Sequence, residues 1–438
     1  MPKFTFSFRT ENLAFVLAVF ITFLVFFAAL FFTSPPEECN NRLDYGLLLL
    51  DYWQDGFWGL LAFSMQMMLI LILGHVLALT PVVKTAIENL IRRTHGAVQM
   101  IVLLSFFSLL AGWFNWGLGL IFSAILAKKM GVHAQKNNIK ISYPLLGAAA
   151  YSCMVVWHAG LSGSAPLSIA EKEHFLMAQS GVVPIDLTLF SPMNLVAVGA
   201  VFVFVPLALV LVHVLQKNKS VPEVTESINY DWLHKHQALN PLCLFLGLLM
   251  LLAAVFQVVG SSGFQAIGLN FVNFALFGLG LLLMGNFTRF LKGVADAIQG
   301  ASGILTQFPL YAGIMGIMSA SGLLDKITLV MLEGANEQTY PIFTFLTATV
   351  VNFFVPSGGG QWAVQGPLIA ASAPEVGVAF PKAVMAMAYG DQLSNMIQPF
   401  WALPLLAITG LMPRAILPFT AIIMLVAGMV YLGVLLIF

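Results

Sequence analysis

The chain has 438 residues, of which 59% are hydrophobic and 9% charged, and 19 Lys and Arg residues balance 19 Asp and Glu residues. Soluble domains carry roughly 25% charged residues, so the composition excludes that class and predicts an all-α integral membrane protein. A net charge of zero leaves no basic field for nucleic acid. Cys39, Cys153 and Cys243 form no Cys-x-x-Cys pair, so we expect neither a disulfide framework nor a thiolate metal site.

The first apolar segment, 13–32, contains no charge and is too long for the core of a signal peptide. We interpret it as a retained span. Lys3 and Arg9 precede it and an acid-rich segment follows, which places the N-terminus in the cytoplasm. A second span, about 57–79, returns to a basic stretch that contains Arg92 and Arg93.

The next apolar stretch, about 96–127, has basic residues on both sides, so both of its ends lie on one side of the membrane. Its roughly 32 residues make about 48 Å of helix, which is too long for one crossing and too short for two. We therefore expect a re-entrant hairpin. Its tip is predicted at Asn115, Trp116 and Gly117, where the broken backbone needs protein or water partners.

The central part of the chain alternates spans with charged loops. The span 143–170 is interrupted at Ser162, Gly163 and Ser164 and leads to an acidic outer loop, from which 187–215 returns. The polar segment 216–240 is interpreted as a cytoplasmic linker. A connector span at about 242–259 and spans at 271–287 and 293–319 follow.

A second hairpin is predicted at about 340–372, this time flanked by an acidic outer loop. Its tip begins at Asn352 and contains Pro356 and three consecutive glycines, which no uninterrupted helix would carry. A broken span from 382 to 414 and a last span from 415 to 438 complete the chain, which places the C-terminus in the periplasm.

Weak internal matches relate the two halves of the chain at an offset near 240 residues. They pair Gly59 and Gln66 with Gly300 and Gln307, Asn115 with Asn352, and Ala150-Tyr151 with Ala388-Tyr389. The hairpins open to sides of opposite charge, so we predict two inverted five-element repeats, at 1–215 and 271–438, with 216–270 as linker and connector. About nine transmembrane helices plus two re-entrant hairpins are expected. Such repeats with broken helices are typical of secondary transporters.

Broken helices that meet at the midplane offer their N-terminal N–H groups to an anion. Because glycine and serine also serve as packing notches between membrane helices, a purely structural role remains open for each break. The candidate substrate-binding residues are Asn115, Trp116, Gly117, Ser162, Gly163, Ser164, Asn352, Ser357, Gly358, Gly359, Gly360, Gln361, Asn395 and Gln398.

Two ionisable residues are the candidates for binding a coupling ion. Asp391 lies within an apolar stretch, where an acid costs roughly 2.5–3.5 kcal/mol, so it is expected to bind a cation or carry a proton, or else to hold a neighbouring hydroxyl or amide. His158 is either a proton or substrate ligand or a satisfied interior histidine. Trp116, Trp362 and Trp401 neighbour the breaks and form either an apolar wall for an alkyl tail or ordinary packing.

Several strings are similar to the short-chain fatty acid transporter family, bacterial permeases linked to acetoacetate and butyrate use. They are Gly56-Phe57-Trp58, Asn115-Trp116-Gly117, Ser162-Gly163-Ser164, Pro356-Ser357-Gly358-Gly359-Gly360, Gln365-Gly366-Pro367 and Gln398-Pro399-Phe400-Trp401. The resemblance implies an inner-membrane carrier of short monocarboxylates in which a hairpin-bearing domain moves as an elevator against a scaffold.

The expected function is therefore cation- or proton-coupled symport of butyrate-type acids, with Na⁺ or H⁺ as coupling ion, no cofactor, no metal beyond a possible Na⁺, and a homodimer as a possible assembly. A carrier of another carboxylate, such as a C4-dicarboxylate, is the alternative. No arginine is present at a predicted tip, which favours a monoanion. An enzyme is disfavoured because Asp391 has no second buried acid beside it in the sequence, and a channel needs more assumptions than a carrier.

Overall fold

The computed structural model describes residues 13–36, 39, 41–216, 220–224, 238–260, 266–353, 355 and 357–438. Several residues used in the sequence argument lie outside this part of the chain: Lys3, Arg9, Pro356 and most of the predicted linker 216–240.

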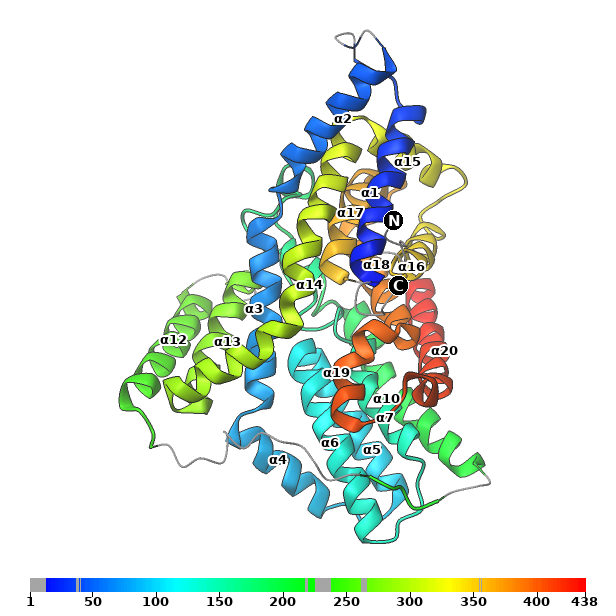
Figure 1. The fold of residues 1–438 in the computed structure, drawn as a ribbon. Helices are drawn as coiled ribbons and strands as arrows, with labels where there is room; N and C mark the ends of the chain where they lie inside the picture. The colour runs from blue at the N-terminus through cyan, green and yellow to red at the C-terminus, as the bar shows by residue number, and fades with distance from the viewer. Residues whose placement is uncertain are drawn as a thin grey trace, which may run out of the picture.

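The described residues form helices and no strand, as the composition predicts (Figure 1). The first half contains α1 (Leu13–Phe32), α2 (Arg42–Phe57), α3 (Leu61–Ala78), α4 (Pro81–Arg92), α5 (Ala97–Phe114), α6 (Trp116–Lys136), α7 (Tyr143–Tyr151), α8 (Ser164–Ser168), α9 (Met177–Ser180) and α10 (Pro192–Leu215). The second half contains α12 (Pro241–Gly260), α13 (Leu269–Met284), α14 (Phe287–Ala320), α15 (Leu323–Leu332), α16 (Tyr340–Val351), α17 (Gly358–Glu375), α18 (Phe380–Ser394), α19 (Pro399–Thr409) and α20 (Pro413–Ile437).

Seven helices are long and apolar enough to cross a membrane: α3, α5, α6, α10, α12, α20 and the second half of α14. This count is made on the described residues and includes both arms of the first hairpin. It agrees with a multi-pass membrane protein, whereas the number of about nine crossings stays a prediction. The acid-rich segment after the first span, in which the sequence predicts no helix, forms helix α2.

Helix starts follow local capping chemistry. Thr80 caps α4 ahead of Pro81, and Ser191 caps α10 ahead of Pro192; both caps are extended, and each side-chain oxygen accepts a backbone N–H of the first turn. Asn115 and Ser357 cap α6 and α17 in the same way. Asn115 therefore ends α5 and begins α6, whereas in the second hairpin Asn352 ends α16 and Ser357 begins α17.

The long helix α14 packs along α1, α2 and α3, and Figure 1 shows this group beside the pair α12 and α13. The crossing of α2 and α14 depends on small residues. A Cβ added to Gly56 would lie 2.7 Å from the Gly316 Cα, and one added to Gly316 would lie 2.5 Å from the Tyr52 carbonyl oxygen. Glycines permit this close backbone approach, as they do at other membrane helix crossings.

The two hairpins occupy different levels of the molecule in Figure 1. In Figure 1, α5 and α6 occupy the lower part, whereas α16 and α17 occupy the upper part next to α18. The two halves of the chain have the same order of elements. Each has a long helix or helix pair followed by a short helix, then a hairpin, a broken helix and a final long helix. This order agrees with an internal repeat, although the proposed boundaries at 215 and 271 stay a prediction.

Candidate functional site

The four helix breaks predicted from the sequence meet in the interior. The backbone N–H of Trp116, at the first hairpin tip, donates to Ser162 Oγ at 2.9 Å. Asn352, at the second hairpin tip, donates through Nδ2 to Asn395 Oδ1 at 2.7 Å. The hydroxyl of Tyr151 donates to the Asn395 carbonyl at 2.8 Å, which joins the two broken helices.

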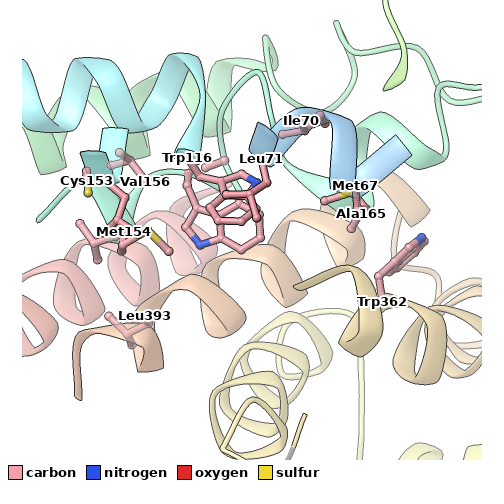
Figure 2. Close-up of a cluster of buried hydrophobic side chains, with 14 of the residues drawn as sticks. Met67, Ile70, Leu71, Trp116, Cys153, Met154, Val156, Ala165, Trp362 and Leu393 are labelled. Carbon is pink, nitrogen blue, oxygen red and sulfur yellow. The ribbon is translucent and has the colours of Figure 1, made fainter. Parts of the chain in front are cut away.

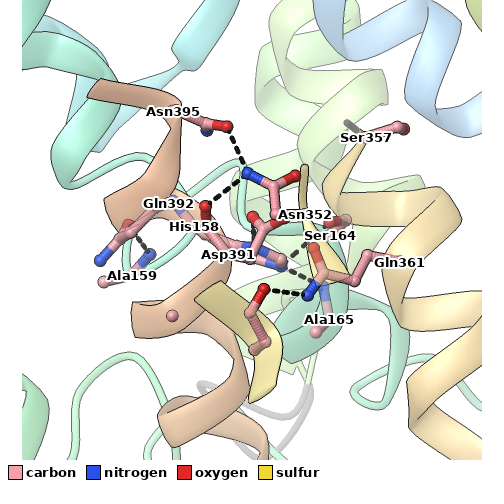
Figure 3. A network of polar contacts seen from close by, with 12 residues as sticks. His158, Ala159, Ser164, Ala165, Asn352, Ser357, Gln361, Asp391, Gln392 and Asn395 are labelled. Atoms are coloured by element: carbon pink, nitrogen blue, oxygen red, sulfur yellow. Dashed lines mark hydrogen bonds and ion pairs between the residues drawn. The ribbon is translucent and has the colours of Figure 1, made fainter. Parts of the chain in front are cut away.

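An entirely buried pair of ionisable side chains lies at this meeting point (Figure 3). His158 Nδ1 is 2.5 Å from Asp391 Oδ2, and both side chains are 0% exposed. The Ala165 N–H donates to His158 Nε2 at 3.0 Å, and Ser164 Oγ lies 3.0 Å from the same nitrogen. Because Nε2 accepts from Ala165, the proton of the neutral ring lies on Nδ1 and is donated to Asp391.

The neighbouring amides hold the backbone around this pair. Gln392 Oε1 accepts the N–H groups of His158 and Ala159 at 2.9 and 3.1 Å. Asp391 Oδ1, by contrast, is buried and has no hydrogen-bond partner in the described part of the chain. A charge on a buried carboxylate oxygen that has no partner is costly.

Further unpaired oxygens surround the second hairpin tip. Asn352 also donates to the Asp391 carbonyl at 2.8 Å and to Ser394 Oγ at 2.9 Å, and its own carbonyl accepts from Gln398 Nε2. The side-chain oxygens of Asn352 and Gln398 are buried and, among the residues with described positions, have no donor. Amide and carboxylate oxygens are the ligands preferred by hard cations.

Three glycines bring the start of α17 into close contact with its surroundings. A Cβ at Gly358 would lie 2.5 Å from the Trp157 ring and 3.0 Å from Asp391 Oδ2. Cβ atoms at Gly359 and Gly360 would lie 2.9 Å from Phe308 and 2.5 Å from Tyr311 on α14. The second tip is thus wedged between the buried ionisable pair and α14, and no larger residue fits without movement.

The first hairpin tip is packed differently. Asn115 Oδ1 accepts the Leu118 N–H at 2.8 Å and Asn115 Nδ2 donates to the Ile70 carbonyl at 3.2 Å, so both polar atoms have partners. A Cβ on Gly117 would lie 2.8 Å from the Leu71 carbonyl oxygen, and one on Gly163 2.2 Å from that of His158. Asn115 and Gly117 thus hold the start of α6 against α3, and Gly163 holds the break before α8 against the His158 backbone.

Gln361 does not lie at a tip. Its Nε2 donates to the Ala348 carbonyl at 2.8 Å and to Gln365 Oε1 at 2.7 Å, which joins α16 to α17 within the second hairpin. Its role is therefore that of a bridge between the two arms.

Between the two tips is a small cavity of about 10 Å³, near the lower limit for holding one water molecule. The indole rings of Trp116 and Trp401 meet edge to face with centroids 5.2 Å apart, and Trp157 lies 6.0 Å from Trp116. The lining residues are Met67, Trp116, Met154, Trp157, Ile304, Phe308, Ser357, Gly358, Gly359 and Trp401.

Trp362 is not part of this aromatic wall, which corrects the sequence-based grouping. It packs 6.3 Å from Phe175 and 6.4 Å from Phe380, and Figure 2 shows it well apart from Trp116. The reason is helical geometry: successive residues of an α-helix are rotated by about 100°, so Trp362, which follows the last glycine of the tip by two residues, points to the opposite side of α17 from Gly360.

Sequence reasoning missed several lining residues. Trp157 stacks on His158 with centroids 4.5 Å apart, and the pair of adjacent aromatic side chains in an apolar stretch was the available signal. Met67, Met154 and Phe308 gave no signal, because an apolar residue that faces a cavity looks like any other core residue in the sequence.

Comparison with known proteins decides the class of this chain. The profile of the family described as "Short chain fatty acid transporter" matches residues 5–438. The chain belongs to the short-chain fatty acid transporter family. A relative from Escherichia coli (strain K12), provisionally named a short-chain fatty acid transporter, is 34% identical over 435 residues, which cover 95% of this chain and 94% of the relative. A similarly named relative from Haemophilus influenzae is 32% identical over 92% of this chain and 91% of its own.

Two solved transporter structures have the same fold as this chain. The YdaH transporter of Alcanivorax borkumensis has a TM-score of 0.67 at 13% identity, with 97% of this chain and 98% of that one covered. MtrF of Neisseria gonorrhoeae, described with a class of antimetabolite efflux pumps, has a TM-score of 0.61 at 15% identity over 98% and 95%. The chain is therefore a multi-pass transporter and not an enzyme.

Proposed function

We propose that this transporter moves short monocarboxylates of the butyrate and acetoacetate type across the cytoplasmic membrane by symport with a proton. The observation that carries the proposal is the His158–Asp391 pair, entirely buried and in contact with the second hairpin tip through Gly358. A proton added to Asp391 Oδ1 removes a buried charge beside the tip, and its release restores that charge. Protonation thereby changes the free energy of closing the tip.

The small cavity between the tips is the proposed substrate site. Trp116 Nε1 and Trp157 Nε1 are buried donors without partners in the described residues, and the first N–H groups of α17 point out of its N-terminus. These donors suit one carboxylate, while Met67, Met154 and Phe308 suit an alkyl chain. The described lining contains no Lys or Arg, which favours a monoanion over a C4-dicarboxylate.

A sodium ion is the second candidate for the coupling ion. The unpaired oxygens of Asp391, Asn352 and Gln398 offer ligands of the kind that a hard cation prefers. Asn395 and Ser394 lie on the same network and position Asn352. Sodium in place of a proton would keep the same residues at the coupling site.

Transport requires the tips to separate, because the cavity of about 10 Å³ is too small for butyrate. We propose an elevator motion in which the hairpins and broken helices slide along α14 and its partners. Support comes from the contact of Gly359 and Gly360 with Phe308 and Tyr311 on α14. We also propose that the protein forms a homodimer, which the mass of the particle in nanodiscs tests. The N-terminus is proposed to be cytoplasmic and the C-terminus periplasmic, which accessibility labelling at the two ends tests.

Uptake of labelled butyrate into proteoliposomes tests the proposal, with proton and sodium gradients imposed separately and succinate as competitor. Empty liposomes subtract passive entry of the undissociated acid. Asp391→Asn and His158→Gln should abolish gradient-driven uptake, whereas Asp186→Asn and His95→Gln, which change exposed residues, should leave it intact.

The outcomes separate the alternatives. Uptake that is driven by the proton gradient and is not inhibited by succinate supports the proposal. Uptake driven only by the sodium gradient would make sodium, in place of the proton, the coupling ion. Strong succinate uptake without butyrate uptake would overturn the monocarboxylate assignment.

A further inference from the structure

Asn194, in the first turn of α10, binds to both broken segments that carry the buried ionisable pair. Its side chain is 0% exposed, and its Nδ2 donates at 3.0 Å to the carbonyl of Ala159, the residue after His158. Its Oδ1 accepts from the hydroxyl of Tyr389, two residues before Asp391, at 2.9 Å. One side chain of α10 therefore links the segment of His158 to the helix of Asp391.

These contacts close a ring around the pair. From His158 the chain runs to Ala159, whose carbonyl is bound by Asn194. Asn194 in turn is bound by Tyr389. The ring returns along α18 to Asp391, whose Oδ2 lies 2.5 Å from His158 Nδ1 (Figure 3). All five members are 0% exposed, and none of them can shift without stretching a bond elsewhere in the ring.

The Tyr389 ring is itself held in place by Tyr431 on α20. The two rings stack with centroids 4.5 Å apart and an interplanar angle of 10°. The Tyr431 hydroxyl donates at 2.6 Å to the carbonyl of Val155, three residues before His158. Packing of its ring therefore directs the Tyr389 hydroxyl toward Asn194.

Packing alone does not require an amide at this position of α10. Other buried positions of the helix, such as Ala197 and Val201, are apolar. A buried amide costs free energy unless its polar atoms are bonded, and Asn194 donates twice through Nδ2 and accepts through Oδ1. The bond to the Leu189 carbonyl, at 2.7 Å, orients the amide so that its second proton meets Ala159.

We propose that Asn194 and Tyr389 are positioning residues that keep the Nδ1–H of His158 in hydrogen-bond contact with Asp391. The inference rests on the proposed function of this pair as the coupling site. Proton transfer needs donor and acceptor within hydrogen-bond reach, and a misplacement of about 1 Å can lower a rate about 100-fold. Neither positioning residue contacts the small cavity between the tips, so their loss slows transport without weakening substrate binding.

Uptake kinetics in proteoliposomes provide the first test. Tyr389→Phe keeps the stacked ring and removes only the hydroxyl, so the maximal rate should fall by about 5- to 30-fold while KM for butyrate changes by less than about twofold. Asn194→Leu should be at least as slow, and the double variant should be no slower than Asn194→Leu because both act through one contact. Tyr45→Phe, which removes a buried hydroxyl bonded to Thr33, is the matched control and should keep the wild-type rate.

The second test observes the pair directly and needs no transport. The full chain in nanodiscs is labelled with nitrogen-15 histidine, and the His158 Nδ1 proton resonance is assigned by its absence in His158→Gln. A short bond to a carboxylate moves this resonance downfield, so it should be present in wild type and Tyr45→Phe. It should be lost in Tyr389→Phe and in Asn194→Leu, with thermal melting to show that both variants are folded.

The two tests separate this inference from the proposed function. A downfield resonance that persists in Tyr389→Phe and Asn194→Leu, or that is missing in wild type, would overturn the positioning role whatever the uptake rates are. Loss of the resonance with an unchanged uptake rate would support the positioning role and overturn the coupling role of the pair.

Discussion

The two hairpin tips differ in how completely their polar groups are satisfied. Each begins with an asparagine, yet both polar atoms of Asn115 have partners, whereas Asn352 Oδ1 is buried without one among the residues that the structure describes. The first tip rests on α3, while the second contacts a buried carboxylate and α14 through consecutive glycines. The two asparagines thus differ: Asn115 is a fully paired cap, whereas Asn352 lies among buried oxygens that have no donor in the described residues. At the first tip the atom that is buried without such a partner is Trp116 Nε1.

The largest expected effect comes from Asp391→Asn. The amide keeps the size of the side chain but holds no exchangeable charge, so proton-driven uptake should be abolished while expression and melting temperature are kept. Uptake by proteoliposomes under an inward proton gradient measures the effect. Normal accumulation by this variant would remove Asp391 from the coupling site.

A paired glycine substitution compares the tips directly. Gly358→Ala places a methyl group 2.5 Å from the Trp157 ring and should lower uptake per folded molecule by about 5- to 100-fold, as overpacking costs about 1–3 kcal/mol. Gly117→Ala meets the Leu71 carbonyl and should lower the melting temperature instead, with uptake per folded molecule retained. The comparison is contradicted if Gly117→Ala impairs transport more than Gly358→Ala.

The two asparagines provide a milder test. Asn115→Ala removes the cap of α6 and should lower the free energy of unfolding by about 1–2 kcal/mol without a change in KM. Asn352→Ala removes donors to Ser394 and Asn395 and should raise KM for butyrate by about 5- to 30-fold, equivalent to about 1–2 kcal/mol. Initial uptake rates and thermal melts separate the two; equal KM changes would mean that the tips share one role.

The smallest effect is expected in the loop beside the second hairpin. Burial lowers the pKa of His174, and its Nδ1 accepts the Leu176 N–H at 3.2 Å. The unfolded chain therefore binds a proton more readily than the folded one, so stability should fall as pH drops below 6.5, by about 1 kcal/mol or less. His174→Gln should remove this pH dependence of the melting temperature, measured between about pH 7.5 and 5, the range in which histidine side chains change their charge. A slope that persists would assign it to other groups.

Helix breaks could be read from the sequence because proline, glycine and capping residues act locally. The breaks at Asn115 and near Ser357 and Gln398 were predicted for this reason and are confirmed. The identity of the buried pair could not be predicted from spacing, because His158 and Asp391 are brought together only by the meeting of two broken helices. Helix α2 was missed, since its acidic residues resemble those of a loop while its other face packs on α14.

The most direct test of the central claim is proton entry measured together with butyrate entry. Proteoliposomes that contain a trapped pH dye are given butyrate without an imposed gradient, and the signal of empty liposomes is subtracted. Proton symport predicts internal acidification that accompanies butyrate uptake in wild type and is lost in Asp391→Asn. Butyrate uptake without acidification, at equal rates in both proteins, would contradict the assignment of His158 and Asp391 as the coupling pair.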